Sequence, residues 1–182
     1  MAARALAMLA TLLGAPGAAE PQTPPVGEAR AGRSAAPEEE ALAVIVNRSN
    51  TVDELEFDEL RRIFLAERSH WPNGRRITVA MRDPGQPERE AALRLIYGMT
   101  EKEFGRYFLH VVFTGEVLSA PKRLATSDVM RRFVFNLPGA IGYVRAADVD
   151  GTVKVLRVDG RGPGEPGYRL ADRPAAPKAR SR

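Results

Sequence analysis

The segment from Val79 to Leu93, "VAMRDPGQPEREAAL", contains the residues whose types and spacing come nearest to a recognisable chemistry. An apolar strand end leads into Arg82, a turn at Gly85 follows, and a helix then begins that carries Arg89. Proteins hold small oxyanions such as phosphate with backbone N–H groups at a helix start and with bidentate guanidinium groups. The segment therefore predicts a binding site for a small anion.

Two residues of the same turn oppose this chemistry. Pro87 has no N–H group to donate and Glu88 brings a carboxylate to the place of the anion, whereas Gln86 keeps an amide that can donate. A second interpretation is an ordinary helix start, because proline at the first helical position and glutamate in the first turn stabilise a helix without any ligand. In that case Arg89 pairs with Glu88, with Glu90 or with a neighbouring helix.

Asn47 and Ser49 are the other candidate ligand-binding residues. They follow the apolar run that begins at Leu42, and ligands of open α/β sheets collect at the carboxyl ends of strands. The two side chains could therefore line the same sheet edge as the arginine turn. The simpler interpretation is that they form a turn and cap it locally.

The remaining composition predicts no metal, no cofactor and no catalytic centre. The chain has no cysteine and two histidines, His70 and His110, which lack a metal-binding spacing. Neither a glycine-rich phosphate cradle of the Walker kind nor a nucleophile elbow occurs. The 27 basic and 23 acidic residues nearly balance, with a formal charge of +4. We therefore expect neither an enzyme nor a nucleic-acid-binding protein.

Strands that alternate with helices between Leu42 and Val158 predict an α/β fold, a sheet with helices on its faces. The helices are marked by apolar stripes, by Pro87 and Gly98 at the ends of one of them, and by a capping box from Thr100 to Glu103 at the start of another. We expect strands within 42–47, 75–81, 138–144 and 152–158, and helices within 55–71, 87–97, 100–113 and from residue 127. The expected core includes Phe64, Ile96, Phe108, Phe133 and Ile141.

The amino-terminal residues 1–19 have the layout of a secretory signal peptide. Arg4 precedes an apolar run from Ala5 to Leu13, and small residues end at Ala19, after which we expect cleavage. The run is too short to span a bilayer, which takes about 20 residues. An alanine-rich leader that stays attached is the alternative. With cleavage, the protein is periplasmic or secreted.

Three further segments complete the predicted organisation. Residues 20–40 are rich in proline, alanine, glycine and charge, and so are predicted to be a disordered linker. Residues 41–159 form the α/β domain. Residues 160–182 return to the composition of the linker and are predicted to be a flexible basic tail.

Several of these runs resemble the substrate-binding proteins of phosphate ABC transporters, a branch of the type II periplasmic binding proteins. The resemblance rests on "LEFDELRRIFLAERSHWPNGRRITVAMRD", with Trp71 before the Gly74 turn, on "LAVIVNRSN" before it, and on "NLPGAIGYV". It covers nearly all of Leu42 to Val158. Full-length members have two lobes, and this chain has room for one. The resemblance implies a compact member: a single lobe of a type II periplasmic-binding-protein fold, with a central mixed sheet flanked by helices.

The resemblance also implies which residues bind the ligand. The family's ligand loop, in outline Arg-x-x-Gly-Ser-Gly-Thr-Arg, aligns with residues 82–89, so Arg82, Gly85, Gln86 and Arg89 take ligand-binding positions. Pro87 and Glu88 stand where the family has glycine and threonine. The implied ligand is phosphate or another small oxyanion, bound weakly if at all, and the implied partner is a membrane transporter or sensor subunit. The alternative is a ligand-free interaction module that docks such a sensor or permease through its open face.

We expect the chain isolated from its native host to begin near Glu20. The reason is the succession of a positive charge, an apolar run and small residues that a signal peptidase cleaves. Mass spectrometry of the intact protein measures this directly. A chain with Met1 intact in the soluble cytoplasmic fraction would contradict the prediction.

Overall fold

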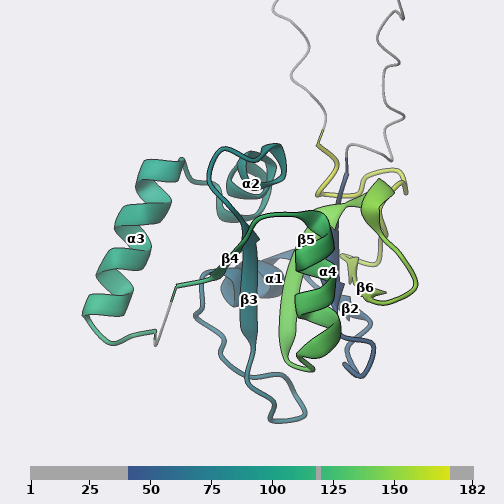
Figure 1. The fold of residues 1–182 in the computed structure, drawn as a ribbon, viewed down its shortest axis with the longest axis horizontal. Helices are drawn as coiled ribbons and strands as arrows, with labels where there is room; N and C mark the ends of the chain where they lie inside the picture. The colour runs from purple at the N-terminus through teal and green to yellow at the C-terminus, as the bar shows by residue number, and fades with distance from the viewer. Residues whose placement is uncertain (1–40, 118–119, 173–182) are drawn as a thin grey trace, which may run out of the picture. The chain divides into compact units, whose positions relative to one another are not determined.

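A five-stranded mixed sheet in the order β4-β3-β5-β1-β6 lies at the centre of the fold (Figure 1). The computed structural model describes residues 41–117 and 120–172. The predicted signal peptide at 1–19, the linker at 20–40 and the last part of the predicted tail lie outside the described residues. No helix in the described part is long and apolar enough to cross a membrane.

The elements follow the alternation that the sequence predicts. In chain order they are β1 (Leu42–Val46), β2 (Glu54–Leu55), α1 (Phe57–Phe64), β3 (Thr78–Arg82), α2 (Pro87–Ala92), the π-helix η1 (Leu93–Tyr97), α3 (Glu101–Phe113), β4 (Lys122–Leu124), α4 (Ser127–Asn136), β5 (Ala140–Arg145), the 3-10 helix η2 (Ala146–Asp148), β6 (Lys154–Val155) and β7 (Arg157–Val158).

The predicted helix boundaries have clear local causes. α2 has Pro87 at its first position, and η1 continues it until Gly98, whose positive φ of 65° ends the helix in the left-handed conformation. The capping box of α3 is present, because the side chain of Thr100 accepts from the backbone of Glu103 and the carboxylate of Glu103 accepts from the backbone N–H of Thr100 at 2.8 Å. α1 is shorter than the predicted segment and ends at Phe64.

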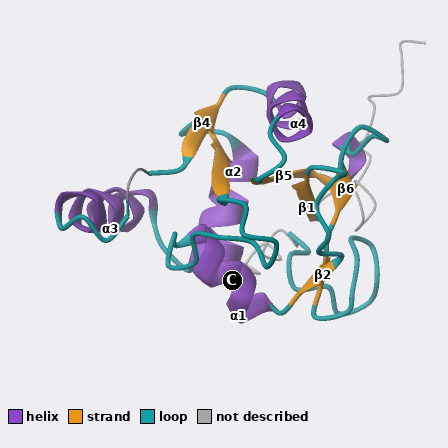
Figure 2. Ribbon diagram, turned by 90° about the horizontal axis from the view of Figure 1, so that it is seen from below, coloured by secondary structure: helices purple, strands orange, loops and turns teal. Residues whose placement is uncertain are grey.

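Helices cover both faces of the sheet. α4 packs on one face. Its Met130 lies close to Gly142 of β5: a Cβ atom added at Gly142 would lie 2.5 Å from the sulfur of Met130. α1, α2 and η1 pack on the other face, and α3 packs against η1 beside the β4 edge (Figures 1 and 2). Because successive residues of a strand point to opposite faces, β1 contributes Val44 to one core and Ile45 to the other. Its five residues are all buried.

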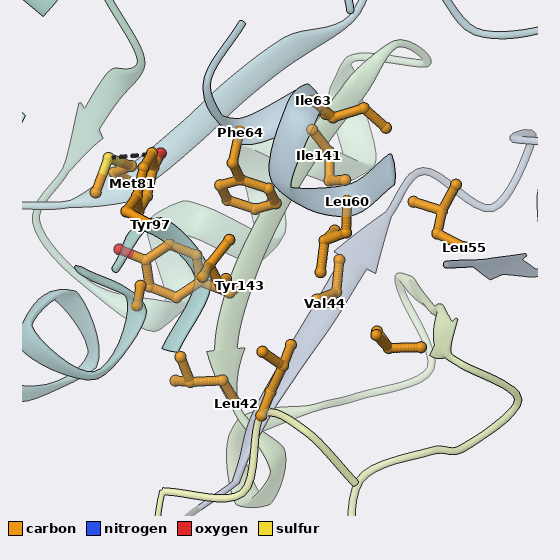
Figure 3. Packing of buried hydrophobic residues seen from close by; sticks show 14 of the residues in the cluster. Leu42, Val44, Leu55, Leu60, Ile63, Phe64, Met81, Tyr97, Ile141 and Tyr143 are labelled. Atoms are coloured by element: carbon orange, nitrogen blue, oxygen red, sulfur yellow. Dashed lines mark hydrogen bonds between the residues drawn. The ribbon is translucent and has the colours of Figure 1, made fainter. Parts of the chain in front are cut away.

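The larger core lies under α1 and η1 and is rich in aromatic rings (Figure 3). Phe64 packs edge-on against Tyr97, with ring centroids 5.8 Å apart, and at 6.1 Å from Tyr143. The hydroxyl of Tyr97 donates to the sulfur of Met81 at 3.2 Å, drawn as a dashed line in Figure 3. Four of the five predicted core residues are buried. The exception is Phe133, which α4 turns far enough from the sheet to leave it only partly buried.

The end of the fold differs from the prediction in two ways. The predicted strand at 152–158 is divided: β6 pairs with β1, whereas β7 pairs with β2 in a separate parallel ribbon. The tail predicted from residue 160 is folded as far as Asp172, the last described residue in this region. The Tyr168 hydroxyl donates to the carbonyl of Leu42 at 2.8 Å, and Leu170 is completely buried. Tyr168 and Leu170, together with the ion pairs of Asp172 to Arg94 and Arg145, therefore hold a segment that its composition predicted to be flexible.

Replacing Phe64 with alanine should lower the free energy of unfolding by about 3–5 kcal/mol, because a completely buried ring leaves a cavity that the aromatic cluster cannot fill. Urea denaturation measures the change. Phe135→Ala on α4 is the matched control, since that ring is 54% exposed and should cost no more than about 0.5 kcal/mol. Equal losses in the two variants would show that the larger core is wrongly described.

Candidate functional site

The predicted anion-binding turn connects the carboxyl end of β3 to α2. Arg82 is the last residue of β3, and Gly85 has the positive φ of 81° that the tight turn requires. The N–H of Gln86 closes the turn on the carbonyl of Asp83 at 3.3 Å, and the helix begins at Pro87. The sequence thus brings Arg82, Gly85, Gln86 and the start of α2 together, as expected.

The guanidinium group of Arg82 is buried among acceptors of its own chain. The residue is 5% exposed. One terminal nitrogen donates to Oε1 of Gln86 at 3.3 Å and the other to the carbonyl of Leu124 on β4 at 3.5 Å. Nε faces Oε2 of Glu88 at 3.5 Å. Glu88 is therefore the carboxylate that neutralises Arg82. The resemblance assigns the same position to a threonine that contacts the ligand.

The pair between Arg82 and Glu88 is matched in charge but not in hydrogen bonds. Nε of Arg82 and Oε2 of Glu88 are both buried, and neither has a hydrogen-bond partner among the described residues. The two side chains are 7% and 12% exposed, so solvent screens their attraction little. A buried donor without an acceptor destabilises the site that contains it. The arrangement can thus accept a better-placed oxygen acceptor at Nε, provided that Glu88 yields the space.

Arg89 is committed to the fold rather than to a ligand. Its Nε and one terminal nitrogen donate to the two carboxylate oxygens of Glu101 at 2.7 and 2.8 Å, and the other terminal nitrogen donates to the carbonyl of Arg82 at 2.8 Å. The guanidinium carbon lies 5.0 Å from the centre of the Phe104 ring. Arg89 is 3% exposed and ties α2 to α3. This is the pairing with a neighbouring helix that the second interpretation of the turn predicts.

Tyr143, which was not predicted as a site residue, lies beneath the turn. Its hydroxyl accepts from the backbone N–H of Arg82 at 3.3 Å. Burial raises the pKa of this hydroxyl, against the opposite effects of the N–H group of Arg82 and of both arginines, so the ring stays neutral at physiological pH. The only signal in the sequence was a residue with a polar tip inside the otherwise apolar run of β5.

Asn47 and Ser49 lie at the other end of the sheet, so the expected shared edge does not form. β1 runs antiparallel to β5, and β3 runs parallel to β5. The carboxyl ends of β1 and β3 therefore point in opposite directions. The amide nitrogen of Asn47 donates to the carbonyls of Val134 and Phe135 at the end of α4, and its oxygen accepts from Ser49. The bonds between Asn47 and Ser49 form the local turn that was the simpler interpretation, whereas the bonds of Asn47 to the end of α4 are long-range contacts that it did not predict.

The arrangement offers one chemical capability, an arginine that can bind an oxygen anion. Among the described residues there is no group of three or more His, Cys, Asp or Glu side chains that could hold a metal ion. The side chains of His70 and His110 are exposed. Trp71 is a core residue that donates to the carbonyl of Gly139 at 3.0 Å.

Comparisons with solved structures bear on this site through the fold. An ABC-type phosphate transport receptor from Vibrio cholerae is 21% identical to the chain, with a TM-score of 0.58 over 71% of this chain and 52% of the receptor. A protein from Clostridium perfringens, described as a phosphate ABC transporter substrate-binding protein and solved with bound phosphate, is 21% identical, with a TM-score of 0.56 over 68% of this chain and 46% of that one. No family model and no curated protein matches the chain.

These similarities show the fold. The chain has the α/β architecture of the substrate-binding proteins of phosphate ABC transporters, over about 70% of its length. It spans about half the length of the solved proteins that it matches. The partial coverage fits a single lobe with a central mixed sheet flanked by helices.

Replacing Arg89 with methionine should lower the free energy of unfolding by about 2–4 kcal/mol, because the buried carbonyl of Arg82 loses its donor and α3 loses its tie to α2. Glu101→Gln should lower the free energy of unfolding by less, since the side chain at this position is half-exposed and water can solvate the glutamine. Urea denaturation of the two single variants and the double variant gives the coupling energy. A coupling energy near zero would contradict the pairing.

Acid should weaken the same pair. The hydrogen bond from Arg89 lowers the pKa of Glu101 below its ordinary value. A carboxylate whose pKa is lower in the folded state stabilises the protein above its unfolded pKa, about 4.3. That stabilisation is lost as the pH falls through the folded pKa. The Glu101→Gln variant should therefore lose less stability than the natural chain when the pH is lowered from about 5 to about 3, a range that brackets this pKa. Parallel pH curves for the two proteins would refute this.

Proposed function

We propose that the protein is a solute-binding-like lobe, related in fold to the substrate-binding proteins of phosphate ABC transporters, that binds phosphate or another small oxyanion weakly through Arg82. The observation that carries the proposal is the buried Nε of Arg82. It faces the carboxylate of Glu88 but has no hydrogen-bond acceptor among the described residues. Gly85 and Gln86 complete the turn around it. The protein acts by binding and not by catalysis.

Glu88 limits the affinity in this proposal. A free oxyanion has to compete with a carboxylate that is already attached to the chain at 3.5 Å from Arg82. Two like charges at one guanidinium repel each other strongly in a site so little exposed to water. Pro87 supplies no N–H, and Arg89 is occupied by Glu101. We therefore expect an affinity in about the millimolar range, worth ~4 kcal/mol.

We further propose that the protein works outside the cytoplasm, in the periplasm or after secretion, together with a membrane transporter or sensor subunit. The signal-like layout of residues 1–19 supports export. The fold supports the association with a transporter, because the solved proteins that share it are receptors and substrate-binding proteins of ABC transporters.

Calorimetry with phosphate and with sulfate tests the proposal. Glu88→Gln should tighten binding by about tenfold relative to the natural chain, or ~1.4 kcal/mol, because the neutral amide no longer competes for Arg82. The triple variant Gln86→Ser, Pro87→Gly, Glu88→Thr, which restores the loop of the resembling family, should tighten binding further. Arg82→Ala should abolish it.

Two variants serve as matched controls. Glu90→Gln makes the same change in an exposed residue of α2, and Arg132→Ala removes an exposed arginine of α4. Neither should alter binding. Should neither the natural chain, nor Glu88→Gln, nor the restored loop bind phosphate or sulfate, the oxyanion role is wrong and the ligand-free interaction module replaces it.

A further inference from the structure

A hollow lies at the amino-terminal end of β3, away from the turn that carries Arg82. Its volume is about 520 Å³, within the range of roughly 300–1,000 Å³ that is usual for small-molecule sites. Thr78 lines the hollow and begins β3, whereas Arg82 ends the same strand. A strand rises about 3.3 Å per residue, so these two residues are roughly 13 Å apart. In Figure 1 the loop from α1 enters β3 at the end opposite to α2.

Core residues form an apolar part of the lining. Ile63 of α1 is completely buried, Ile77 is nearly so, and Val79 of β3 packs against the same core. Ile77 and Val79 are two residues apart in extended chain, so their side chains point to the same face of the sheet. An apolar group that lies on these side chains gains free energy by leaving water.

Positively charged residues from two separate segments line the same hollow. Arg68 and Arg76 come from the loop between α1 and β3, and Lys122 comes from β4. Arg68 pairs with Glu59. The side chains of Arg76 and Lys122, in contrast, have no hydrogen bond or ion pair with any described residue. Two cations at one hollow therefore lack an opposite charge.

The acidic residues of the lining do not cancel this charge. Among the described residues that line the hollow, Glu116 is the only acidic one, and its Oε1 accepts a hydrogen bond from the hydroxyl of Thr114 at 2.9 Å. Arg76 and Lys122 thus stand against one carboxylate that already has a partner. The hydroxyl of Thr78 adds a hydrogen-bond donor to the lining. The balance of charge favours an anionic ligand.

We propose that this hollow binds a small organic anion, a molecule that carries one carboxylate or phosphate group on an apolar body. Arg76 and Lys122 bind the anionic group through charge-assisted hydrogen bonds. The apolar body lies on Ile63, Ile77 and Val79. An apolar lining with a few polar groups that fix the orientation is the usual composition of a small-molecule site. The site differs from the turn at Arg82 in its place and in its class of ligand.

Nuclear magnetic resonance of the full chain, labelled with nitrogen-15, tests the proposal with benzoate and phenyl phosphate as probes. At least one of them should shift the amide signals of residues 63–70 and 76–79, with a dissociation constant of about 1 mM or lower. The probe that binds more tightly identifies the anionic group. Benzamide has the ring without the charge, and acetate has a charge without the ring. Each should bind at least about tenfold more weakly than the tighter probe.

Neighbouring residues provide matched controls for the two cations. Arg76→Gln and Lys122→Gln should each weaken binding of the tighter probe by about fivefold or more. Arg75→Gln should not change it, because Arg75 donates to the hydroxyl of Ser49 and does not line the hollow. Arg123→Gln should not change it either, because Arg123 lines a different hollow beside α3. All four substituted side chains are exposed, so the fold should be kept.

Three results would overturn the proposal. The first is that neither probe shifts the signals of residues 63–70 and 76–79. The second is that benzamide binds as tightly as the anionic probes, and the third is that Arg76→Gln binds the tighter probe as well as Arg75→Gln does. The signals of residues 82–89 report separately on the turn, so that failure of the oxyanion role there and failure of this site are distinguished in the same spectra.

Discussion

Two buried arginines, Arg82 at the end of β3 and Arg89 in α2, have to be neutralised inside the protein. A guanidinium group withdrawn from water destabilises the fold unless acceptors and an opposite charge replace its hydration. Arg89 meets this need with the carboxylate of Glu101 and the carbonyl of Arg82. Because Glu101 is the first residue of α3, this bidentate pair attaches the start of α3 to α2.

Arg82 is neutralised less completely than Arg89, and our proposal for the turn rests on this difference. Glu88 supplies the charge, Gln86 and Leu124 supply acceptors, but Nε lacks a hydrogen bond. A site built only for stability would close this gap, whereas a site built for a tightly held oxyanion would not contain a competing carboxylate. The turn lies between these extremes. It holds a buried arginine whose charge is neutralised by a carboxylate of the same chain.

Local signals in the sequence predicted the elements well, because caps and apolar stripes act over a few residues. The capping box at Thr100, the helix end at Gly98 and the buried run of β1 are examples. The position of Asn47 could not be predicted in the same way, since it depends on the direction of β1 within the sheet. The choice of Glu88 as the partner of Arg82, and of Glu101 as the partner of Arg89, depends likewise on rotamers and helix packing. Tyr168 and Leu170 were missed because each is a single apolar residue in a glycine- and proline-rich segment.

The position of β1 has a consequence for how the protein reaches its structure. The first described strand lies between β5 and β6, which are made after the other strands of this sheet, and Leu42 also holds the segment that ends at Leu170. Contacts between residues so far apart in the chain require the closure of a long loop before they stabilise anything, which slows folding. Helices such as α3 can form early, but the sheet cannot close until β5 and β6 have been synthesised. The order of synthesis therefore places closure of the sheet after formation of its local helices.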